Sequence, residues 1–329
     1  MSDIVTFGEI MLRLSPPGSS RIAQAGHFEI TFGGAEANVA VCIAQLGGSA
    51  DFVTKLPPGA LGQRAIDELR RTGVGVAGIV RGGERLGIYF LEQGASQRPG
   101  TVIYDRAGSA MAGAQPGEFD WDAIFTGAHW FHWSGITPAL SDAAAALTAE
   151  ACAAAKRLGL RVSFDMNYRA KLWTRERAGA VLAPLMQHVD LCITSVEEAR
   201  TVFGLDTADS EEGAAASLRA RFGFGTVAFT ARQGDSASAT SWGAVLFAEG
   251  RAYRSRRHEI QIVDRVGAGD SFSGALIFSL MRGDDPQRTV DFAVAASALK
   301  HTIPGDFALL SLGEVEALAA GGAGGRVQR

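Results

Sequence analysis

The sequence predicts an α/β fold, built on a doubly wound, mostly parallel sheet flanked by helices, with a small β-sheet lid. Short apolar runs with the character of buried strands alternate with helix-patterned segments along most of the 329 residues, which is typical of parallel sheets with crossover helices. The length suits one large α/β domain or two medium ones. Near residues 86–106 the alternation gives way to two successive β-patterned runs, which predicts a separate small sheet.

The N-terminal region predicts two strands and two helices of the main sheet. Residues 3–8 have the pattern of a buried strand that ends in glycine, and Pro16 and Pro17 break the short run that follows. The segment GGAEANVAVCIAQLGG, residues 33–48, predicts a glycine turn that leads into a buried helix. ADFVTKL then predicts a strand, and LGQRAIDELRRTG predicts an amphipathic helix that stops at glycine.

The next two runs predict a β-hairpin. RLGIYFLEQ and GTVIYDRAG are joined by the Gly/Ser/Pro-rich link GASQRP, which indicates a hairpin rather than a βα unit. Such a hairpin does not fit a parallel sheet, so we expect it to form the lid together with residues 15–32. The expected division is a core of residues 1–14, 33–84 and 107–329, and a lid of residues 15–32 and 85–106.

From about residue 127 the alternation of strands and helices returns. AHWFHWSG, RVSFD, LCITS and TVAFTA each predict a strand, with helices between them. Ser141 is expected to cap the Ala-rich helix that ends at Gly159, because serine oxygens accept hydrogen bonds from the first free amides of a helix. The pattern therefore extends the doubly wound sheet towards the C-terminus.

Composition excludes several classes of function. The net charge of −4 and pI near 5.9 argue against a protein that binds nucleic acid or a membrane surface, because both need clustered Lys and Arg. Cys42, Cys152 and Cys192 lie in apolar segments and are expected to be buried, reduced thiols of a cytoplasmic protein. No zinc-ligand spacing, signal peptide or membrane-spanning run is recognised.

The stretch IVDRVGAGDSFSGALIF raises the question of what Asp270 does behind Gly267-Ala268-Gly269. The helical spacing that follows places these residues at a helix N-terminus, where free amides and a partial positive charge attract anions. Glycines let the backbone approach such an anion closely. Asp270 is then either a base that takes a proton from a hydroxyl attacking a phosphoryl group, or simply the helix N-cap.

A second glycine stretch, TFGGAEANVA, places Asn38 one turn into a helix and among apolar neighbours. A buried amide needs a hydrogen-bond partner, which is either a sugar hydroxyl or a backbone carbonyl. Both glycine stretches, at opposite ends of one α/β chain, are the pattern of the ribokinase-like (PfkB) carbohydrate kinases. The chain resembles that family throughout, from VTFGEI to ALKHTIPGD.

Candidate cations indicate the kind of sugar. Tyr104 and Arg106 lie two apart on a predicted lid strand and share a face, and Tyr89 could join them from the neighbouring strand. Arg169 follows RVSFD, at the carboxyl end of a strand, where ligands of such sheets bind. Two arginines favour a sugar acid, because guanidinium matches carboxylate. The alternative is that they form surface ion pairs with Asp105 and Asp165.

Five segments, YFLEQGASQRP, VIYDRAGSA, SGITPAL, DMNYRAKLW and TIPGD, are similar to those of 2-keto-3-deoxygluconate kinases. The resemblance implies that ATP, as its Mg²⁺ complex, phosphorylates the C6 hydroxyl to give 2-keto-3-deoxy-6-phosphogluconate, beneath the lid; a requirement for a monovalent cation is left open. It also implies a set of residues around the sugar acid. These are Gly34, Asn38, Tyr89, Tyr104, Arg106, Ile136, Asn167, Arg169 and Asp306.

At the reacting end, the resemblance implies that Asp270 is the base and that the amides of Gly267, Ala268 and Gly269 form the anion hole. Glu198 would organise the metal through water. Ser195, Thr230 and Arg232 are the expected nucleotide contacts, beside Gly267 and Gly269.

Three positions depart from the family pattern. The usual Asn-x-x-Glu is here Ser195-x-x-Glu198, and the frequent TLGxxG is TARQGDSA. Arg265 stands where the family commonly has a small residue or proline, and it either contacts nucleotide phosphate or pairs with an acid.

Two other functions remain open on the sequence. One is a kinase of the same fold that acts on a neutral sugar such as fructose or ribose, and the other is a non-catalytic sugar- or nucleotide-binding regulator. The GAGD sequence favours catalysis, because a pure binder gains nothing from a base beside a phosphate pocket. An exposed apolar lid surface with Ile88, Phe90 and Val102 predicts a homo-oligomer formed through the lid. Acceptance of the galactonate-derived C4 epimer is left open.

Overall fold

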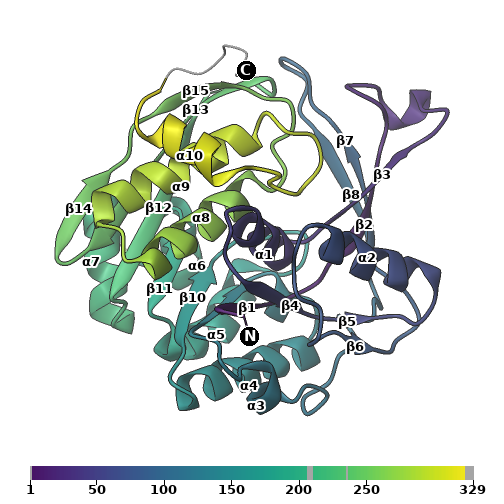
Figure 1. The fold of residues 1–329 in the computed structure, drawn as a ribbon, viewed down its shortest axis with the longest axis horizontal. Coiled ribbons are helices and arrows are strands. Elements are labelled where there is room, and N and C mark those ends of the chain that lie inside the picture. The colour runs from purple at the N-terminus through teal and green to yellow at the C-terminus, as the bar shows by residue number, and fades with distance from the viewer. Residues whose placement is uncertain (1, 206–209, 235, 323–329) are drawn as a thin grey trace.

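The computed structural model describes residues 2–205, 210–234 and 236–322; residues 323–329 of the expected core fall outside them. Its centre is a twisted sheet with helices on both faces (Figure 1). Among the described residues the sheet consists of β1 (Ile4–Phe7), β4 (Ala50–Val53), β9 (Trp130–Ser134), β10 (Arg161–Asp165), β11 (Leu191–Thr194), β12 (Thr226–Gln233), β13 (Ala239–Ala248), β14 (Arg251–Arg254) and β15 (His258–Gln261).

The strand order is β14-β13-β12-β11-β10-β9-β1-β4, and β15 also pairs with β13. The pairs from β4 to β12 are parallel, whereas β13 is antiparallel to its neighbours. The expected doubly wound, mostly parallel sheet is therefore confirmed, with an antiparallel extension at one edge. This extension follows from short connections after β12, which cannot accommodate the long crossover that a parallel partner needs.

The helices pack on both faces because successive side chains of a strand point to opposite sides. On β1, Ile4 belongs to one apolar core, and Val5 and Phe7 belong to the other. The first core contains α1, α8 and α9, and the second contains α4 to α7. The helices are α1 (Ala35–Gln45), α2 (Ala60–Arg71), α3 (Trp121–Ile124), α4 (Asp142–Arg157), α5 (Arg175–Leu185), α6 (Val196–Phe203), α7 (Glu211–Phe222), α8 (Ala268–Arg282), α9 (Pro286–Lys300) and α10 (Leu312–Ala319).

Side-chain caps fix several of these helices. Ser141 accepts a hydrogen bond from the amide of Ala144 at the start of α4, as the sequence predicts. Cys42, Cys152 and Cys192 are buried and free, which confirms the expected thiols. None of the described helices is both long and apolar enough to cross a bilayer.

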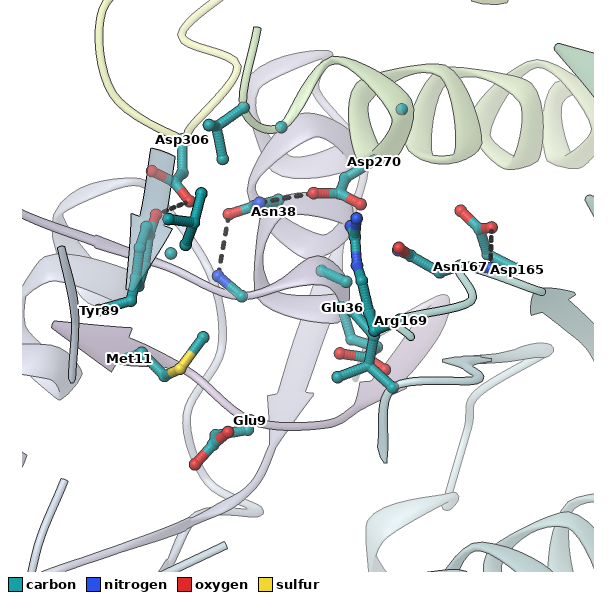
Figure 2. Close-up of a pocket in the computed structure, with 18 of the residues that line it drawn as sticks. Glu9, Met11, Glu36, Asn38, Tyr89, Asp165, Asn167, Arg169, Asp270 and Asp306 are labelled. Atoms are coloured by element: carbon teal, nitrogen blue, oxygen red, sulfur yellow. Dashed lines mark hydrogen bonds between the residues drawn. The ribbon is translucent and has the colours of Figure 1, made fainter. Parts of the chain in front are cut away.

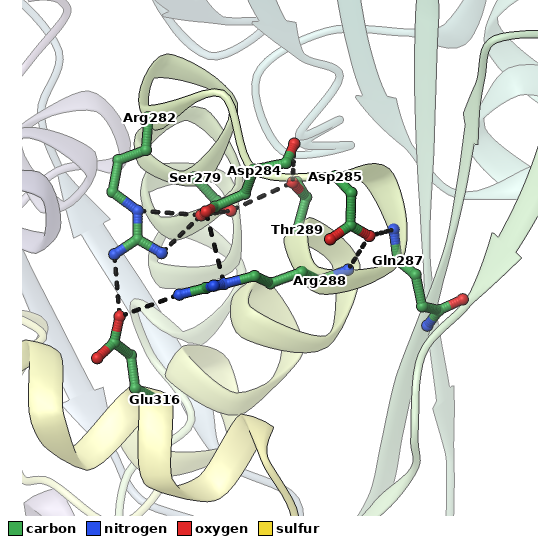
Figure 3. Close-up of polar contacts among 8 residues, drawn as sticks. All are labelled: Ser279, Arg282, Asp284, Asp285, Gln287, Arg288, Thr289 and Glu316. Atoms are coloured by element: carbon green, nitrogen blue, oxygen red, sulfur yellow. Dashed lines mark hydrogen bonds and ion pairs between the residues drawn. The ribbon is translucent and has the colours of Figure 1, made fainter.

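The far end of α8 is held by an ion-pair network (Figure 3). Arg282 and Arg288 both contact Asp284, in the turn between α8 and α9, and Glu316 on α10. Ser279 donates to the carboxylate of Asp284 at 2.7 Å. The network joins three helices, so α8 is anchored at the end opposite its functional N-terminus.

The lid is a four-stranded sheet, at the upper right of Figure 1, in the order β3-β2-β7-β8. It contains β2 (Met11–Ser15), β3 (Glu29–Gly33), β7 (Ile88–Glu92) and β8 (Thr101–Asp105). The predicted hairpin is present, because β7 and β8 pair antiparallel. The expected division after residue 14 falls within β2, all five residues of which pair with β3 in the lid sheet. A small parallel pair of β5 (Lys55–Leu56) and β6 (Val80–Arg81) lies apart from both sheets.

The two faces of the lid have different characters. Arg13, Tyr89 and Tyr104 lie on the face towards the core, since Arg13 pairs with Tyr89 and Tyr89 with Tyr104 across the strands. Val102 also lines the cavity beneath the lid, so the expectation that it is part of the exposed surface is wrong. Alternation along β8 explains this, because Val102 shares the face of Tyr104.

Candidate active site

A cavity of about 370 Å³ lies where the carboxyl ends of the core strands meet the lid (Figure 2). This is where ligands bind in open α/β sheets. Most of the residues expected from the sequence line it: Gly34, Asn38, Tyr89, Tyr104, Arg106, Ile136, Asn167, Arg169, Glu198, Thr230, Gly267, Gly269, Asp270 and Asp306. Three expected residues do not line it: Ala268, Ser195 and Arg232.

Asp270 is held at the cavity by Asn38. The amide Nδ2 of Asn38 donates to Oδ2 of Asp270 at 2.6 Å, and its Oδ1 accepts from the Gly34 amide at 3.3 Å (Figure 2). The partner of Asn38 within the protein is therefore a carboxylate, not a backbone carbonyl. The N-cap of α8 is Gly267 rather than Asp270, which stands in the first turn. The alternative that Asp270 is simply the helix N-cap is therefore wrong.

The environment of Asp270 favours a base that works near neutral pH. Burial raises the pKa of its carboxyl to about 6, although the hydrogen bond from Asn38 and the charge of Arg169 oppose this. The guanidinium of Arg169 points towards Asp270 in Figure 2. A base of this pKa is ionised at neutral pH and still accepts a proton readily.

The backbone in front of Asp270 has amides without acceptors and open space before them, as expected of an anion site. The first hydrogen bond of α8 runs from the Ser271 amide to the Gly267 carbonyl at 2.8 Å, so the amides of Gly269 and Asp270 have no acceptor within the helix. The amide of Ala268 instead reaches the Arg265 carbonyl at 3.4 Å. A Cβ added to Gly269 would meet no atom within 4 Å, so open space lies in front of the helix.

Gly267 has to be glycine for two reasons. Its φ of 82° lies in the left-handed region, and an added Cβ would come within 2.0 Å of the carbonyl oxygen of Asp306. The start of α8 is therefore packed directly against the loop that carries Asp306. The Tyr89 hydroxyl donates to Oδ2 of that carboxylate at 2.5 Å.

Arg106 lines the cavity, but its ion-pair partner is not Asp105, the partner considered as an alternative on the sequence. Its Nε donates to Oε2 of buried Glu9 at 2.8 Å, and its Nη2 also contacts Glu9. Asp105 pairs instead with Arg85. Glu9 and Arg106 both line the cavity, and Nη1 of Arg106 makes no hydrogen bond with the described residues. The sequence reasoning missed Glu9, whose signal was an acid inside the apolar segment FGEIM.

The loop after β10 presents Asn167 and Arg169. Asn167 has a φ of 39°, which is uncommon for a residue other than glycine. Its backbone amide donates to Oδ1 of Asp165 at 3.2 Å. Arg169 forms no ion pair with any described residue, so the considered pair with Asp165 is absent. It is an exposed cation that lines the cavity.

Two further acids were not foreseen. Glu36 is buried in the first turn of α1, where it accepts hydrogen bonds from the hydroxyls of Ser134 and Thr137, and burial raises the pKa of its carboxyl to about 7. Asp165 accepts from the Ser273 hydroxyl at 3.1 Å, and burial followed by repulsion from Asp270 raises its pKa well above the usual value. Glu36 and Asp165 tie α1 and α8 to the ends of β9 and β10.

Comparison with known proteins decides the family. The model of the pfkB family of carbohydrate kinases matches residues 1–308. The chain belongs to this family. A 2-dehydro-3-deoxygalactonokinase from Haloferax volcanii is 39% identical, with 98% of each chain covered. The solved structure of a 2-dehydro-3-deoxygluconokinase from Thermotoga maritima is 50% identical with a TM-score of 0.95, covering 97% of this chain and 100% of that one.

A third relative has been solved with its nucleotide bound. The structure of a fructokinase with bound ATP from Xylella fastidiosa is 26% identical, with a TM-score of 0.81, and covers 98% of this chain and 99% of that chain. The fold and the resemblance noted in the sequence are thus confirmed. The family's phosphate donor needs an anion site, and the open helix end at Gly269 fits it.

The acids at the cavity suit the metal that a pfkB kinase uses with ATP. Glu198 and Asp165 offer carboxylate oxygens, which Mg²⁺ prefers. Glu198 already accepts from the Tyr168 amide at 3.0 Å and the Ser195 amide at 3.1 Å. No group of three or more acidic, His or Cys side chains in the described ranges could hold a metal ion.

Thr230 and Arg265, both considered as nucleotide contacts on the sequence, lie in the cavity wall. Arg265 donates to the carbonyls of Ser236 and Ala237 at 3.3 and 3.2 Å, and pairs with no acid among the described residues. Burial and the nearby charge of Arg232 lower its pKa. Ser195 serves as the cap of α6, donating to and accepting from Glu198.

The pH profile of this kinase should report Asp270. A base at Asp270 would have to be ionised, so kcat/KM should fall as the pH drops through the pKa of about 6, by about ten-fold per unit, and level off above pH 7. Steady-state rates from pH 5 to 8 measure this. In Asp270→Asn, kcat should be lower by roughly 10²–10⁴-fold and the acid limb should disappear.

The Asp270→Asn variant also tests how the Asp270 carboxyl affects the stability of the fold. The raised folded-state pKa means that the wild type loses stability as the pH rises from 3.8 towards 6. Asp270→Asn should therefore melt no lower than the wild type above pH 7. An acid limb that persists in the variant would assign it to another group, such as Glu36.

Proposed function

We propose that the chain is an ATP-dependent kinase of a 2-keto-3-deoxy (2-dehydro-3-deoxy) sugar acid. Its expected substrate is 2-keto-3-deoxygluconate, phosphorylated at the C6 hydroxyl to 2-keto-3-deoxy-6-phosphogluconate. The observation that carries the proposal is the carboxylate of Asp270 held at the mouth of α8, in one cavity with Arg106 and Arg169. The named activities of the 39% and 50% identical relatives support the substrate class.

The proposed reaction is a transfer of the terminal phosphoryl group of ATP. The C6 oxygen attacks the phosphorus, its proton passes to Asp270, and the bond from phosphorus to the ADP oxygen breaks. The amides of Gly267 and Gly269 are the proposed anion hole, with Gly269 facing open space, whereas the Ala268 amide, also expected there, is hydrogen-bonded to the Arg265 carbonyl. Mg²⁺, held through water by Glu198 and Asp165, would neutralise charge on the phosphates.

Arg106 and Arg169 have different roles in this proposal. Arg106 offers its unused Nη1 to the sugar carboxylate, while Glu9 fixes the other side of the guanidinium. Arg169 points towards Asp270, so it serves the reacting end, where negative charge gathers. Tyr89, Tyr104 and Asp306 line the same cavity.

The apolar outer face of the lid supports the proposed homo-oligomer. Ile30, Leu14, Phe90 and Ile103 occupy one row across the four strands, and Ile30 and Ile103 are 61% and 50% exposed. An apolar row with exposed side chains at both ends suits a second copy of the same chain. The requirement for a monovalent cation and the cytoplasmic location stay predictions.

A substrate panel tests the proposed activity directly. With ADP release as the readout, 2-keto-3-deoxygluconate should be turned over with a kcat/KM at least about 10-fold above fructose and ribose, because a charged hydrogen bond contributes about 1.5–3 kcal/mol. The galactonate-derived epimer belongs in the same panel, because one relative is named for it. Faster turnover of fructose would favour the neutral-sugar kinase, and binding without ADP release would favour the regulator.

Carboxylate recognition is tested by a charge-balanced pair of variants. Glu9→Gln keeps the charge of Arg106, whereas the double variant Glu9→Gln with Arg106→Gln removes it without leaving an unpaired buried acid. We expect the double variant to raise KM for the sugar acid roughly 10–100-fold over the single one, with KM for ATP unchanged. A loss confined to kcat would contradict this role for Arg106.

The lid interface is tested by charge on its outer face. Ile103→Lys places a cation on a residue that is 50% exposed, so the fold should be retained while the oligomer dissociates. Sedimentation at micromolar concentrations measures the change. Leu158→Lys, on a side chain that is 42% exposed and remote from the lid, is the matched control and should not alter the mass. A wild type that sediments as a monomer would refute the interface.

A further inference from the structure

Arg13 forms a buried bridge that neither the sequence reasoning nor the cavity explains. It lies on lid strand β2 and is only 2% exposed. Its Nη1 donates to Oδ1 of Asp306 at 2.8 Å, and its Nη2 donates to Oδ2 of Asp264 at 2.6 Å. Its Nε donates to the Ser15 hydroxyl at 2.8 Å. One side chain of the lid thus holds two carboxylates of the core.

The two carboxylates belong to the loops that shape the anion site. Asp264 accepts from the amide of Val266 at 3.0 Å and from that of Gly305 at 3.1 Å. Val266 directly precedes Gly267, and Gly305 directly precedes Asp306. Asp264 therefore joins the loop before α8 to the loop that ends in Asp306.

These two loops are in close backbone contact. A Cβ added to Gly267 would come within 2.0 Å of the Asp306 carbonyl oxygen, so the two loops leave no space for a side-chain atom between them. A shift of Asp306 is therefore transmitted to Gly267 and to the amides that follow it. Since close-packed structures transmit displacement, the position of the anion site depends on what holds Asp306 and Asp264.

The geometry of the bridge requires a guanidinium. Arg13 uses separate nitrogens for separate carboxylates, and a planar fork keeps both directions fixed. The two carboxylates raise its pKa in spite of burial, so the guanidinium stays charged. Buried Lys300 supplies a second positive charge nearby and donates to the Ile303 carbonyl at 3.1 Å. A lysine at position 13 could not hold both carboxylates in the same directions.

Other lid groups reach the same carboxylates. The Tyr89 hydroxyl binds Asp306 at 2.5 Å, and the Gln93 amide donates to Asp264 at 3.3 Å. Two strands of the lid are thus attached to the loops around the anion site. A buried ion pair adds little stability compared with apolar packing, so its value here lies in geometry.

We propose that Arg13 is a positioning residue for phosphoryl transfer. It couples the lid over the sugar to the amides at Gly267–Gly269 by holding Asp264 and Asp306 in one arrangement. The inference rests on the proposed role of these amides as the anion hole. Arg13 itself does not line the cavity and is not a catalytic residue.

Three variants of the full-length chain test this role. Arg13→Lys keeps the charge but not the fork. Arg13→Gln combined with Asp264→Asn removes one positive and one negative charge together, so no uncompensated charge is buried if the lysine variant fails to fold. Arg85→Lys is the control, because Arg85 pairs with Asp105 on the lid without reaching either loop. Melting temperature, kcat, both KM values and calorimetric ATP binding are measured for each.

We expect Arg13→Lys and the double variant to lose roughly 10–100-fold in kcat, with KM for the sugar acid changed by less than about 3-fold. ATP binding should also weaken in both, and Arg85→Lys should match the wild type. The calorimetric result does not depend on which sugar is turned over, so it tests the inference even if the proposed substrate is wrong.

Several results would overturn the role of Arg13. Wild-type kcat and ATP affinity in folded Arg13→Lys would show that the anion site does not depend on it. A loss that appears only as a lower melting temperature, with kcat per folded molecule retained, would make the bridge merely structural. A rise confined to KM for the sugar acid would assign Arg13 to the Tyr89–Asp306 contact instead.

Discussion

The hydrogen bond between Asn38 and Asp270 is the contact on which the site depends. It joins the first turn of α1 to the first turn of α8, across 232 positions of the chain. Each helix begins at a glycine, and each exposes its free amide end to the same cavity. A carboxylate at such an end is favoured by the helix dipole, and Asn38 gives it a fixed direction.

Around this contact, the protein buries carboxylates and satisfies each with particular donors. Glu36 receives hydroxyls from the end of β9, Asp165 receives the Ser273 hydroxyl, and Glu9 receives Arg106. A buried polar group without partners is costly, so each of these acids specifies the relative position of two elements. The wall of the cavity is therefore rigid on the core side, where its acids bind the elements together.

Local sequence patterns predicted the fold well, because the alternation of apolar runs and helices follows directly from a parallel sheet. Most of the cavity wall, including Asp270, Gly269 and Tyr89, was expected from the resemblance to a known family, because a glycine turn before a helix has a purely structural use as well. Local patterns failed where long-range pairing decides. Arg13, Glu9 and Glu36 are polar residues inside apolar segments, and only the folded chain shows which distant group each one meets. The boundary expected after residue 14 falls inside β2 for a similar reason, since the pairing of β2 with β7 joins distant segments.

The alternation of side chains along the lid strands limits where residues can be inserted or deleted. Tyr89 and Tyr104 face the cavity, whereas the adjacent Phe90 and Ile103 face outwards. Because a strand alternates its side chains strictly, a one-residue insertion within β7 or β8 would exchange the two faces along the rest of that strand. Indels in this hairpin are therefore tolerable only in the connecting loop or in even-numbered steps, which constrains its evolution more tightly than its exposed position suggests.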